Sequence, residues 1–167
     1  MSLWNADEIT EGAANSMSVT ESSHSSADIE LPFNGGCVCG EVRYECNSLP
    51  LVMVKCHCLD CQRVSGGPYA PVLSVPLSSF RVTRGEMKRF ATTRISGKPN
   101  LRGFCANCGS RLTVGEDLIR NLVGIMAGSL DDPGLFKPSM DIFVRDAQRW
   151  DLMDAILPKH DQYMPRK

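Results

Sequence analysis

The chain has 167 residues, of which 43% are hydrophobic and 22% are charged, and its formal net charge is −1. This length suits one soluble globular domain with a buried core, and the sequence has no apolar run of about 18 residues that could span a membrane. A net charge so close to zero gives no reason to expect nucleic acid as a partner.

Residues 1–30 differ in composition from the rest of the chain. They contain six acidic residues and seven serines but no Lys or Arg. Such a segment buries too little apolar surface to fold alone, so we predict a disordered or loosely attached tail over 1–30 and a folded domain over 31–167. The folded part has 18 basic against 13 acidic residues. That excess suits a small anionic ligand, although an ordinary mixed surface is the commoner cause.

The folded part predicts a mainly β protein, because short β-rich runs alternate with Gly and Pro. Residues 41–46 alternate with a period of two, which is typical of a half-buried strand. Gly85 and Glu86 indicate a hairpin between two of the further strands. Those strands are expected at 51–54, 69–75, 80–84, 87–94, 101–104, 111–114, 122–127 and 142–144.

One short C-terminal helix is predicted over residues 149–157. Pro158 would end it. Its apolar residues fall on one side at helical spacing, which favours packing against the sheets; they are Trp150, Met153, Ile156 and Leu157.

Seven of the eight cysteines fall into three short clusters: Cys37 and Cys39; Cys56, Cys58 and Cys61; Cys105 and Cys108. Thiols this close in sequence are poorly placed to pair with one another but converge well on a metal. The N-terminus has the features of neither a secretory signal nor a mitochondrial presequence. We therefore expect a reduced, cytoplasmic, metal-binding protein rather than a disulfide scaffold, with zinc favoured over iron.

The first and third clusters each lie on a turn flanked by glycine, which tolerates a positive φ. Two such turns facing each other make a four-thiolate site, as in a zinc ribbon. Zinc binding would offset the entropy of closing the long loop between them. We assign to this structural zinc Cys37, Cys39, Cys105 and Cys108.

The remaining three cysteines, Cys56, Cys58 and Cys61, form a local tripod for a second zinc. Its fourth position would be open to water or substrate, or filled by a protein group such as His57, Asp60 or Cys46. An extended segment would turn His57 away from its neighbours, so it is favoured as a neighbour rather than a ligand. Cys46 ends a predicted strand and is favoured as a buried thiol. A catalytic zinc and a second structural zinc both remain open on this reasoning.

Basic residues near the tripod are a further feature. Arg63 would offset the tripod's charge or bind a carboxylate, although an exposed or structural arginine is commoner. Seven more bases would either receive carboxylates or form the solvated face of strands, which is the commoner arrangement; they are Arg81, Arg84, Lys88, Arg89, Arg94, Lys98 and Arg102.

Residues 35–44, 56–66 and 104–110 strongly resemble the glutathione-dependent formaldehyde-activating enzyme family, and 128–133, 141–144 and Trp150 are similar to its C-terminal part. The resemblance covers roughly residues 33–165. It implies twisted antiparallel β-sheets clamped by a structural zinc, similar to methionine sulfoxide reductase B, with the catalytic zinc on Cys56, Cys58 and Cys61. Where many members carry His, this chain has Asp141.

The resemblance implies formation or cleavage of the carbon–sulfur bond of S-(hydroxymethyl)glutathione. Three cysteinates on Zn²⁺ leave a net charge of about −1, which favours carrying a thiolate over activating water. We therefore expect a zinc-dependent carbon–sulfur lyase acting on adducts of glutathione, or a related thiol, with a small aldehyde such as formaldehyde. Two zinc ions per chain are expected, with glutathione as a candidate co-substrate. The alternative is a non-catalytic, zinc-stabilised binding module.

Overall fold

The computed structural model describes residues 29–93, 97 and 99–163. The tail predicted over residues 1–30 lies outside the described residues, except for its last two positions, and stays a prediction together with the domain boundary at residue 31.

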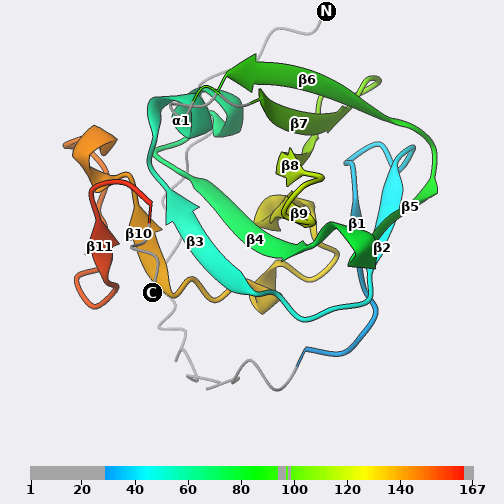
Figure 1. Cartoon of the computed structure of the whole chain (residues 1–167), viewed down its shortest axis with the longest axis horizontal. Coiled ribbons are helices and arrows are strands. Elements are labelled where there is room, and N and C mark those ends of the chain that lie inside the picture. Colours follow the sequence, from blue (N-terminus) through cyan, green and yellow to red (C-terminus); the bar gives the residue numbers. More distant parts are fainter. Residues whose placement is uncertain (1–28, 94–96, 98, 164–167) are drawn as a thin grey trace, which may run out of the picture.

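The protein is mainly β, as predicted, with two sheets (Figure 1). The smaller sheet is antiparallel in the order β1-β2-β5, with bounds Phe33–Gly36, Arg43–Cys46 and Phe80–Arg84. The larger sheet has the order β11-β10-β3-β4-β9-β8-β7-β6. Its strands, in chain order from β3 and without β5, are Val52–Cys56, Ala70–Pro76, Met87–Thr93, Pro99–Cys105, Arg111–Asp117, Leu122–Met126, Met140–Ile142 and Lys159–His160.

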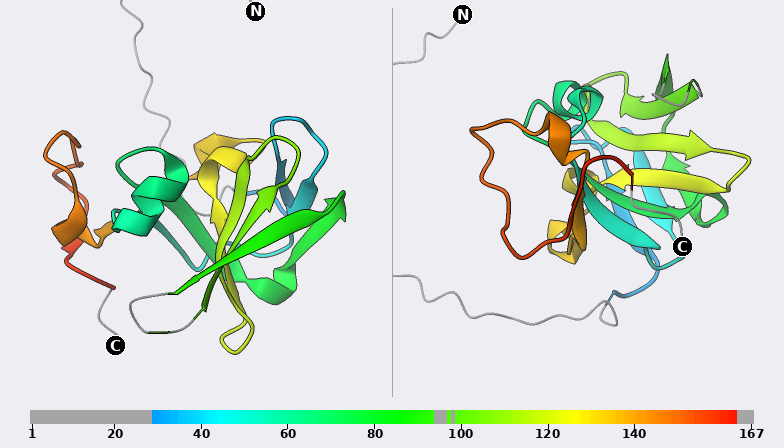
Figure 2. Two further views of the ribbon diagram at one scale, coloured as in Figure 1. Left: turned by 90° about the horizontal axis from the view of Figure 1, so that it is seen from above. Right: turned by 60° about the vertical axis from the view of Figure 1, so that its left-hand side comes forward.

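The larger sheet is mixed rather than purely antiparallel. Strand β10 runs parallel to both β3 and β11, whereas the other pairs are antiparallel. The parallel pairing brings Ile142 opposite Cys56, at the end of β3. Figure 2 shows the strong twist of this sheet, with the C-terminal strands β10 and β11, in orange and red, at the end of the sheet beyond β3.

The predicted hairpin around Gly85 is wrong. Gly85 does turn the chain, with a φ of +70°, and an added Cβ there would lie 2.3 Å from the carbonyl oxygen of Glu41. The flanking strands, however, pair elsewhere: β5 pairs with β2, and β6 pairs with β7. The turn therefore carries the chain from one sheet to the other.

The predicted C-terminal helix over residues 149–157 is also wrong, because this segment forms turns and irregular structure. Trp150 and Ile156 are 66% and 90% exposed, so they meet no surface that would stabilise so short a helix. Instead, the Lys159 ammonium donates to the carbonyls of Asp154 and Leu157. The α-helix among the described residues is α1 (Leu59–Ser65), inside the second cysteine cluster. None of the described helices has the length and apolar character needed to cross a bilayer.

The described residues also form four short 3₁₀ turns: η2 (Leu77–Ser79), η3 (Ala127–Ser129), η4 (Pro133–Leu135) and η5 (Val144–Asp146). The main core contains side chains that are at most 1% exposed, among them Tyr44, Leu73, Leu112 and Ile125. Burying a side chain such as Leu73 contributes about 1.5–3 kcal/mol. A second core of Val54, Val72, Met126 and Phe143 includes Cys56 and Cys61, so the second cysteine cluster is built on packed apolar residues.

Candidate metal centres

The first candidate centre contains the four cysteines assigned by sequence to one site. Their sulfur atoms all lie within 4.8 Å of one another, with Cys37 Sγ 3.4 Å from Cys39 Sγ and Cys39 Sγ 3.8 Å from Cys105 Sγ. Two sulfurs on a tetrahedral zinc with Zn–S bonds of about 2.3 Å are about 3.8 Å apart. The set Cys37, Cys39, Cys105 and Cys108, the four-thiolate cluster below, therefore fits zinc.

Two tight turns from different sheets hold this cluster. Gly40 N donates to Cys37 O and Gly109 N to Cys105 O, each at 2.9 Å. Both glycines have a positive φ, +73° and +75°, as the glycine-flanked turns predicted. One turn follows β1 in the smaller sheet and the other follows β7 in the larger sheet, so the cluster fastens the two sheets together.

Polar hydrogens point at these sulfurs, as thiolates require. Val42 N donates to Cys37 Sγ at 3.2 Å, and Asn107 Nδ2 donates to Cys39 Sγ at 3.5 Å. Hydrogen bonds from the side chain and backbone of Ser110 lower the pKa of Cys108 to about 5. The surroundings therefore favour charged sulfur at Cys108, whereas the pKa of Cys105 is raised to about 11, with burial the main cause of the rise.

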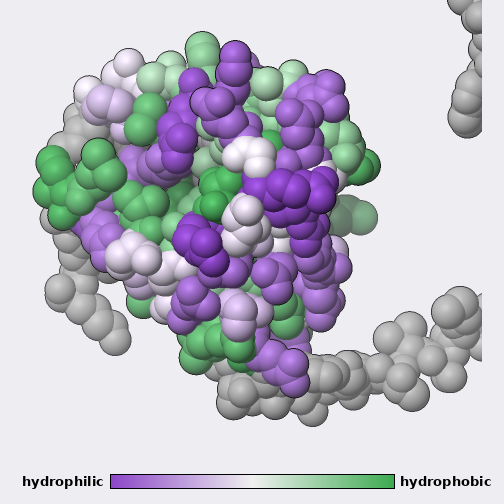
Figure 3. Space-filling model, turned by 90° about the vertical axis from the view of Figure 1, so that its right-hand side faces the viewer, coloured by the Kyte–Doolittle hydropathy of each residue, from purple (hydrophilic) through white to green (hydrophobic). Residues whose placement is uncertain are grey.

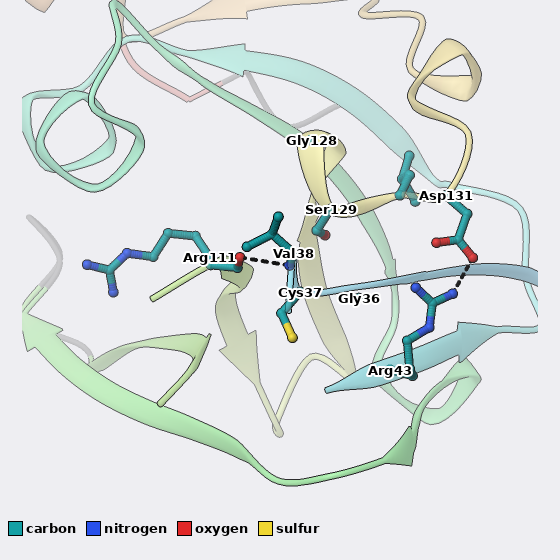
Figure 4. A pocket seen from close by; sticks show the side chains of 10 residues that line it. Gly36, Cys37, Val38, Arg43, Arg111, Gly128, Ser129 and Asp131 are labelled. Carbon is teal, nitrogen blue, oxygen red and sulfur yellow. Dashed lines mark hydrogen bonds and ion pairs between the residues drawn. The ribbon is translucent and has the colours of Figure 1, made fainter. Parts of the chain in front are cut away.

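A cavity of about 360 Å³ adjoins the four-thiolate cluster (Figure 4). Figure 4 shows the Arg43 guanidinium turned toward Asp131, with which it forms a hydrogen-bonded ion pair. Val38 N donates to the Ser110 hydroxyl at 3.1 Å. Two other polar side chains drawn around this hollow have partners outside it, since Ser129 hydrogen-bonds Tyr44 and Arg111 lies over the Phe104 ring.

The second candidate centre is the tripod of Cys56, Cys58 and Cys61. Cys56 is the last residue of β3, Cys58 is the N-cap of α1, and Cys61 lies in the first turn of α1. Their sulfurs also lie within 4.8 Å of one another, with Cys56 Sγ 3.7 Å from Cys58 Sγ, a spacing that again fits zinc. Hydrogen bonds from Cys56 and Cys61 lower the pKa of Cys58, whereas those to Cys58 and Cys61 raise the pKa of Cys56.

Within the described part of the chain, no fourth His, Cys, Asp or Glu joins the tripod. Each fourth ligand considered from the sequence is engaged elsewhere. His57 is fully buried between two carboxylates, the half-exposed Asp60 forms a 3.8 Å ion pair with Arg63, and Cys46 lies 3.5 Å from the Ser79 hydroxyl in the main core.

His57 links the tripod to the C-terminal segment. Its Nε2 lies 2.9 Å from Asp141 Oδ1 and its Nδ1 lies 3.1 Å from Asp151 Oδ2. His57 N also donates to Ile142 O at 2.9 Å. Asp141, which stands where the resemblance led us to expect His, is therefore buried against His57 and does not line the cavity described next. Asp151 is a partner that the sequence did not reveal, because nothing in its spacing relates it to residue 57.

The tripod faces a cavity of about 990 Å³, which is near the upper end for sites that bury a drug-sized ligand. All three tripod sulfur residues line it. Its apolar wall comes from the strands around β3, β4, β8, β9 and β10 and comprises Val52, Val54, Val72, Val114, Leu122, Val123, Met140 and Ile142, with Phe143 beyond β10. Four arginines add positive charge, namely Arg63, Arg102, Arg120 and Arg145.

Of the basic residues singled out from the sequence, Arg94 and Lys98 lie outside the described residues, and the others differ in exposure. Arg63, Arg81 and Arg89 have exposed side chains paired with acids, which is the commoner arrangement expected for them. Hydrophilic residues gather on the side of the molecule where β1, β2 and β5 lie (Figure 3). Arg102 differs, since its side chain is 3% exposed and lines the cavity. No spacing in the sequence distinguishes it, because alternation along a strand does not show which of the two faces is buried.

Comparison with protein families matches residues 32–146 to the family described as glutathione-dependent formaldehyde-activating enzyme. The matched region contains both cysteine centres. No curated protein matches the chain. A crystal structure of a protein from Rhodobacter sphaeroides is similar with a TM-score of 0.47 and 24% sequence identity, over 59% of this chain and 87% of that one.

Proposed function

Because the chain belongs to the family of glutathione-dependent formaldehyde-activating enzymes, we propose that it is a carbon–sulfur lyase. It forms or cleaves the bond between a thiol, glutathione or a related one, and a small aldehyde such as formaldehyde. One observation carries this proposal: the tripod of Cys56, Cys58 and Cys61 faces a cavity of about 990 Å³ and has no fourth ligand among the described residues.

The proposal assigns two zinc ions to each chain, one to the four-thiolate cluster and one to the tripod, since both sulfur sets have the spacing of zinc ligands. When bound to the tripod, zinc would supply a deprotonated thiol, because a coordinating thiol loses its proton. The three thiolates of the tripod would leave the site with a net negative charge even when zinc is bound. This charge would make the zinc a poor activator of water, which favours thiol chemistry over hydrolysis.

The cavity residues hold the two reactants together. In the direction of synthesis, a sulfur lone pair forms the new carbon–sulfur bond and the π pair of the carbonyl moves onto its oxygen. The proton that left the thiol ends on that oxygen. The apolar wall, with Val54, Val72 and Ile142, limits water around the reacting atoms and helps to orient them.

Exchange NMR with ¹³C-formaldehyde and glutathione tests the proposal on the zinc-loaded full chain. The exchange rate should exceed the spontaneous rate in proportion to protein concentration. Cys58→Ser should remove most of this increase, whereas Cys46→Ala, which changes a thiol outside both centres, should keep it. An exchange rate equal to that of buffer in the wild type would contradict the lyase and favour the zinc-stabilised binding module.

A further inference from the structure

Arg102 is a charged side chain inside the wall of the tripod cavity. Only 3% of it is exposed, and its Nε and Nη2 atoms are buried without a hydrogen-bond partner. Its ion pair with Asp60 spans 3.9 Å from Nη2 to Oδ2, which is longer than a hydrogen bond. An ion taken out of water needs such partners, because desolvation is costly unless hydrogen bonds replace the lost water.

The position of Arg102 on β7 directs it toward the tripod. Its neighbour Gly103 faces the core, where an added Cβ would lie 2.3 Å from both Met87 Sδ and Thr113 Oγ1. Alternation along the strand places Arg102 on the opposite side, and it lines the same cavity as Cys58 and Cys61. Besides the hydrogen bonds from Cys56 and Cys61, the charge of Arg102 contributes to the lowered pKa of Cys58.

The other three arginines of the cavity lie in different surroundings. The side chains of Arg63, Arg120 and Arg145 are 75%, 49% and 44% exposed. Each lies within 4 Å of an acid close in sequence: Asp60, Asp117 and Asp146, respectively. Water and a neighbouring carboxylate therefore satisfy these charges, whereas Arg102 is desolvated before any ligand arrives.

We propose that Arg102 binds an anionic oxygen of the substrate beside the tripod. The inference rests on the proposed function. It adds one property of the substrate: the substrate carries a negatively charged oxygen, although the site is already made negative by three thiolates. A guanidinium suits this task because its donors form a fixed fork for oxygen and it stays charged at all relevant pH values.

Two oxygens have this chemistry: a carboxylate of the thiol, and the carbonyl oxygen that gains charge when sulfur attacks the aldehyde.

Thermal-shift titrations distinguish these two possibilities by comparing three thiols: 3-mercaptopropionate, its neutral analogue 3-mercaptopropanol, and glutathione. The proteins are the zinc-loaded wild type, Arg102→Met, and Arg81→Met as a control for an exposed arginine outside the cavity. Metal analysis confirms that each variant keeps both zinc ions.

If Arg102 binds a carboxylate, R102M should weaken the binding of 3-mercaptopropionate and glutathione by about 10- to 100-fold, the scale of hydrogen bonds to charged groups. Binding of the neutral thiol should not change, and R81M should behave as the wild type. If Arg102 instead binds the carbonyl oxygen, R102M should keep its affinity for all three thiols but form the formaldehyde adduct about 100- to 1,000-fold more slowly.

Thiol affinities and rates that stay within twofold of wild type in R102M would overturn the inference while leaving the lyase intact. Carboxylate-dependent binding in a protein that shows no turnover would instead support Arg102 and contradict the lyase. A wild type that neither binds these thiols nor accelerates the adduct contradicts both. Arg102→Gln, which removes the charge but keeps a donor, provides the same comparison if the methionine variant does not fold.

Discussion

The two cysteine centres use the same ligand atom in opposite surroundings. The four-thiolate cluster joins turns that lie 66 residues apart between Cys39 and Cys105, and it fastens one sheet to the other. The tripod comes from the end of β3 and the start of α1, and it faces a cavity of about 990 Å³. The comparison indicates that two properties set the role of each centre: how many sulfurs it contains and how far apart in the sequence they lie. On the proposed function, four distant sulfurs would close the fold, whereas three local ones would leave a position for a substrate.

The largest expected effect comes from Cys105→Ser, which removes one sulfur of the four-thiolate cluster. Zinc binding supplies about 10–16 kcal/mol to folding in small zinc domains, which exceeds the about 5–15 kcal/mol stability of a typical domain. The variant should therefore fail to fold or melt tens of degrees lower. Circular dichroism with metal analysis measures this, and a melt within a few degrees of wild type would contradict the structural role.

Cys58→Ser should leave the fold largely intact, because the tripod is local and closes no long loop. We expect loss of the second zinc and at least about a 100-fold loss of activity, as for removal of groups that act directly in catalysis. Metal stoichiometry, thermal melting and formaldehyde exchange are measured on one preparation. A loss of stability equal to that of Cys105→Ser would make both centres structural and erase the comparison.

Asp141→Ala should lower stability by a smaller amount, and it tests whether the contact with His57 helps to hold the tripod in place. The change leaves the buried Nε2 of His57 without its partner at 2.9 Å, and an unsatisfied buried group costs about 1–3 kcal/mol. Urea unfolding of the zinc-loaded protein measures the cost. Asp154→Ala, at an exposed position, is the control, and equal stability in both variants would show that the His57 contact contributes little.

The smallest effect concerns thiol reactivity after a mild chelator has removed the tripod metal. The pKa of Cys58 is lowered by hydrogen bonds from Cys56 and Cys61, so its thiolate persists as the pH falls. At pH 6 an ordinary thiol, with a pKa of about 8.5, is almost fully protonated. Iodoacetamide should therefore label Cys58 faster than Cys61, as read by peptide mass spectrometry. Preferential labelling of Cys61 would contradict this prediction, because it would show that Cys61, and not Cys58, carries the thiolate.

The convergence of the cysteines could be predicted because spacing and flanking glycines are local properties. The hairpin at Gly85 could not, since a turn residue fixes the local φ but does not determine which strands pair. The helix over 149–157 failed for a similar reason: periodicity indicates an apolar face without showing whether a surface exists to cover it. Trp150 and Ile156 find none among the described residues.

The sequence also placed Arg102 among solvated bases, because a charged residue in a strand is usually exposed. Only the tertiary structure shows that its side chain is buried beside the tripod. Asp151 was missed because its contact with His57 joins residues 94 positions apart. The parts of the site that a metal gathers could thus be read from spacing, whereas the surrounding charges depend on how the sheets pack.

Zinc-edge X-ray absorption tests the central claim, an open fourth position at the tripod, most directly. With both centres loaded, the average sulfur count per zinc should be about three and a half, and it should rise to about four when glutathione is added. Glutathione should also raise the melting temperature, because a ligand that binds only the folded state stabilises it. A sulfur count that stays constant at millimolar glutathione, without stabilisation, would contradict the account.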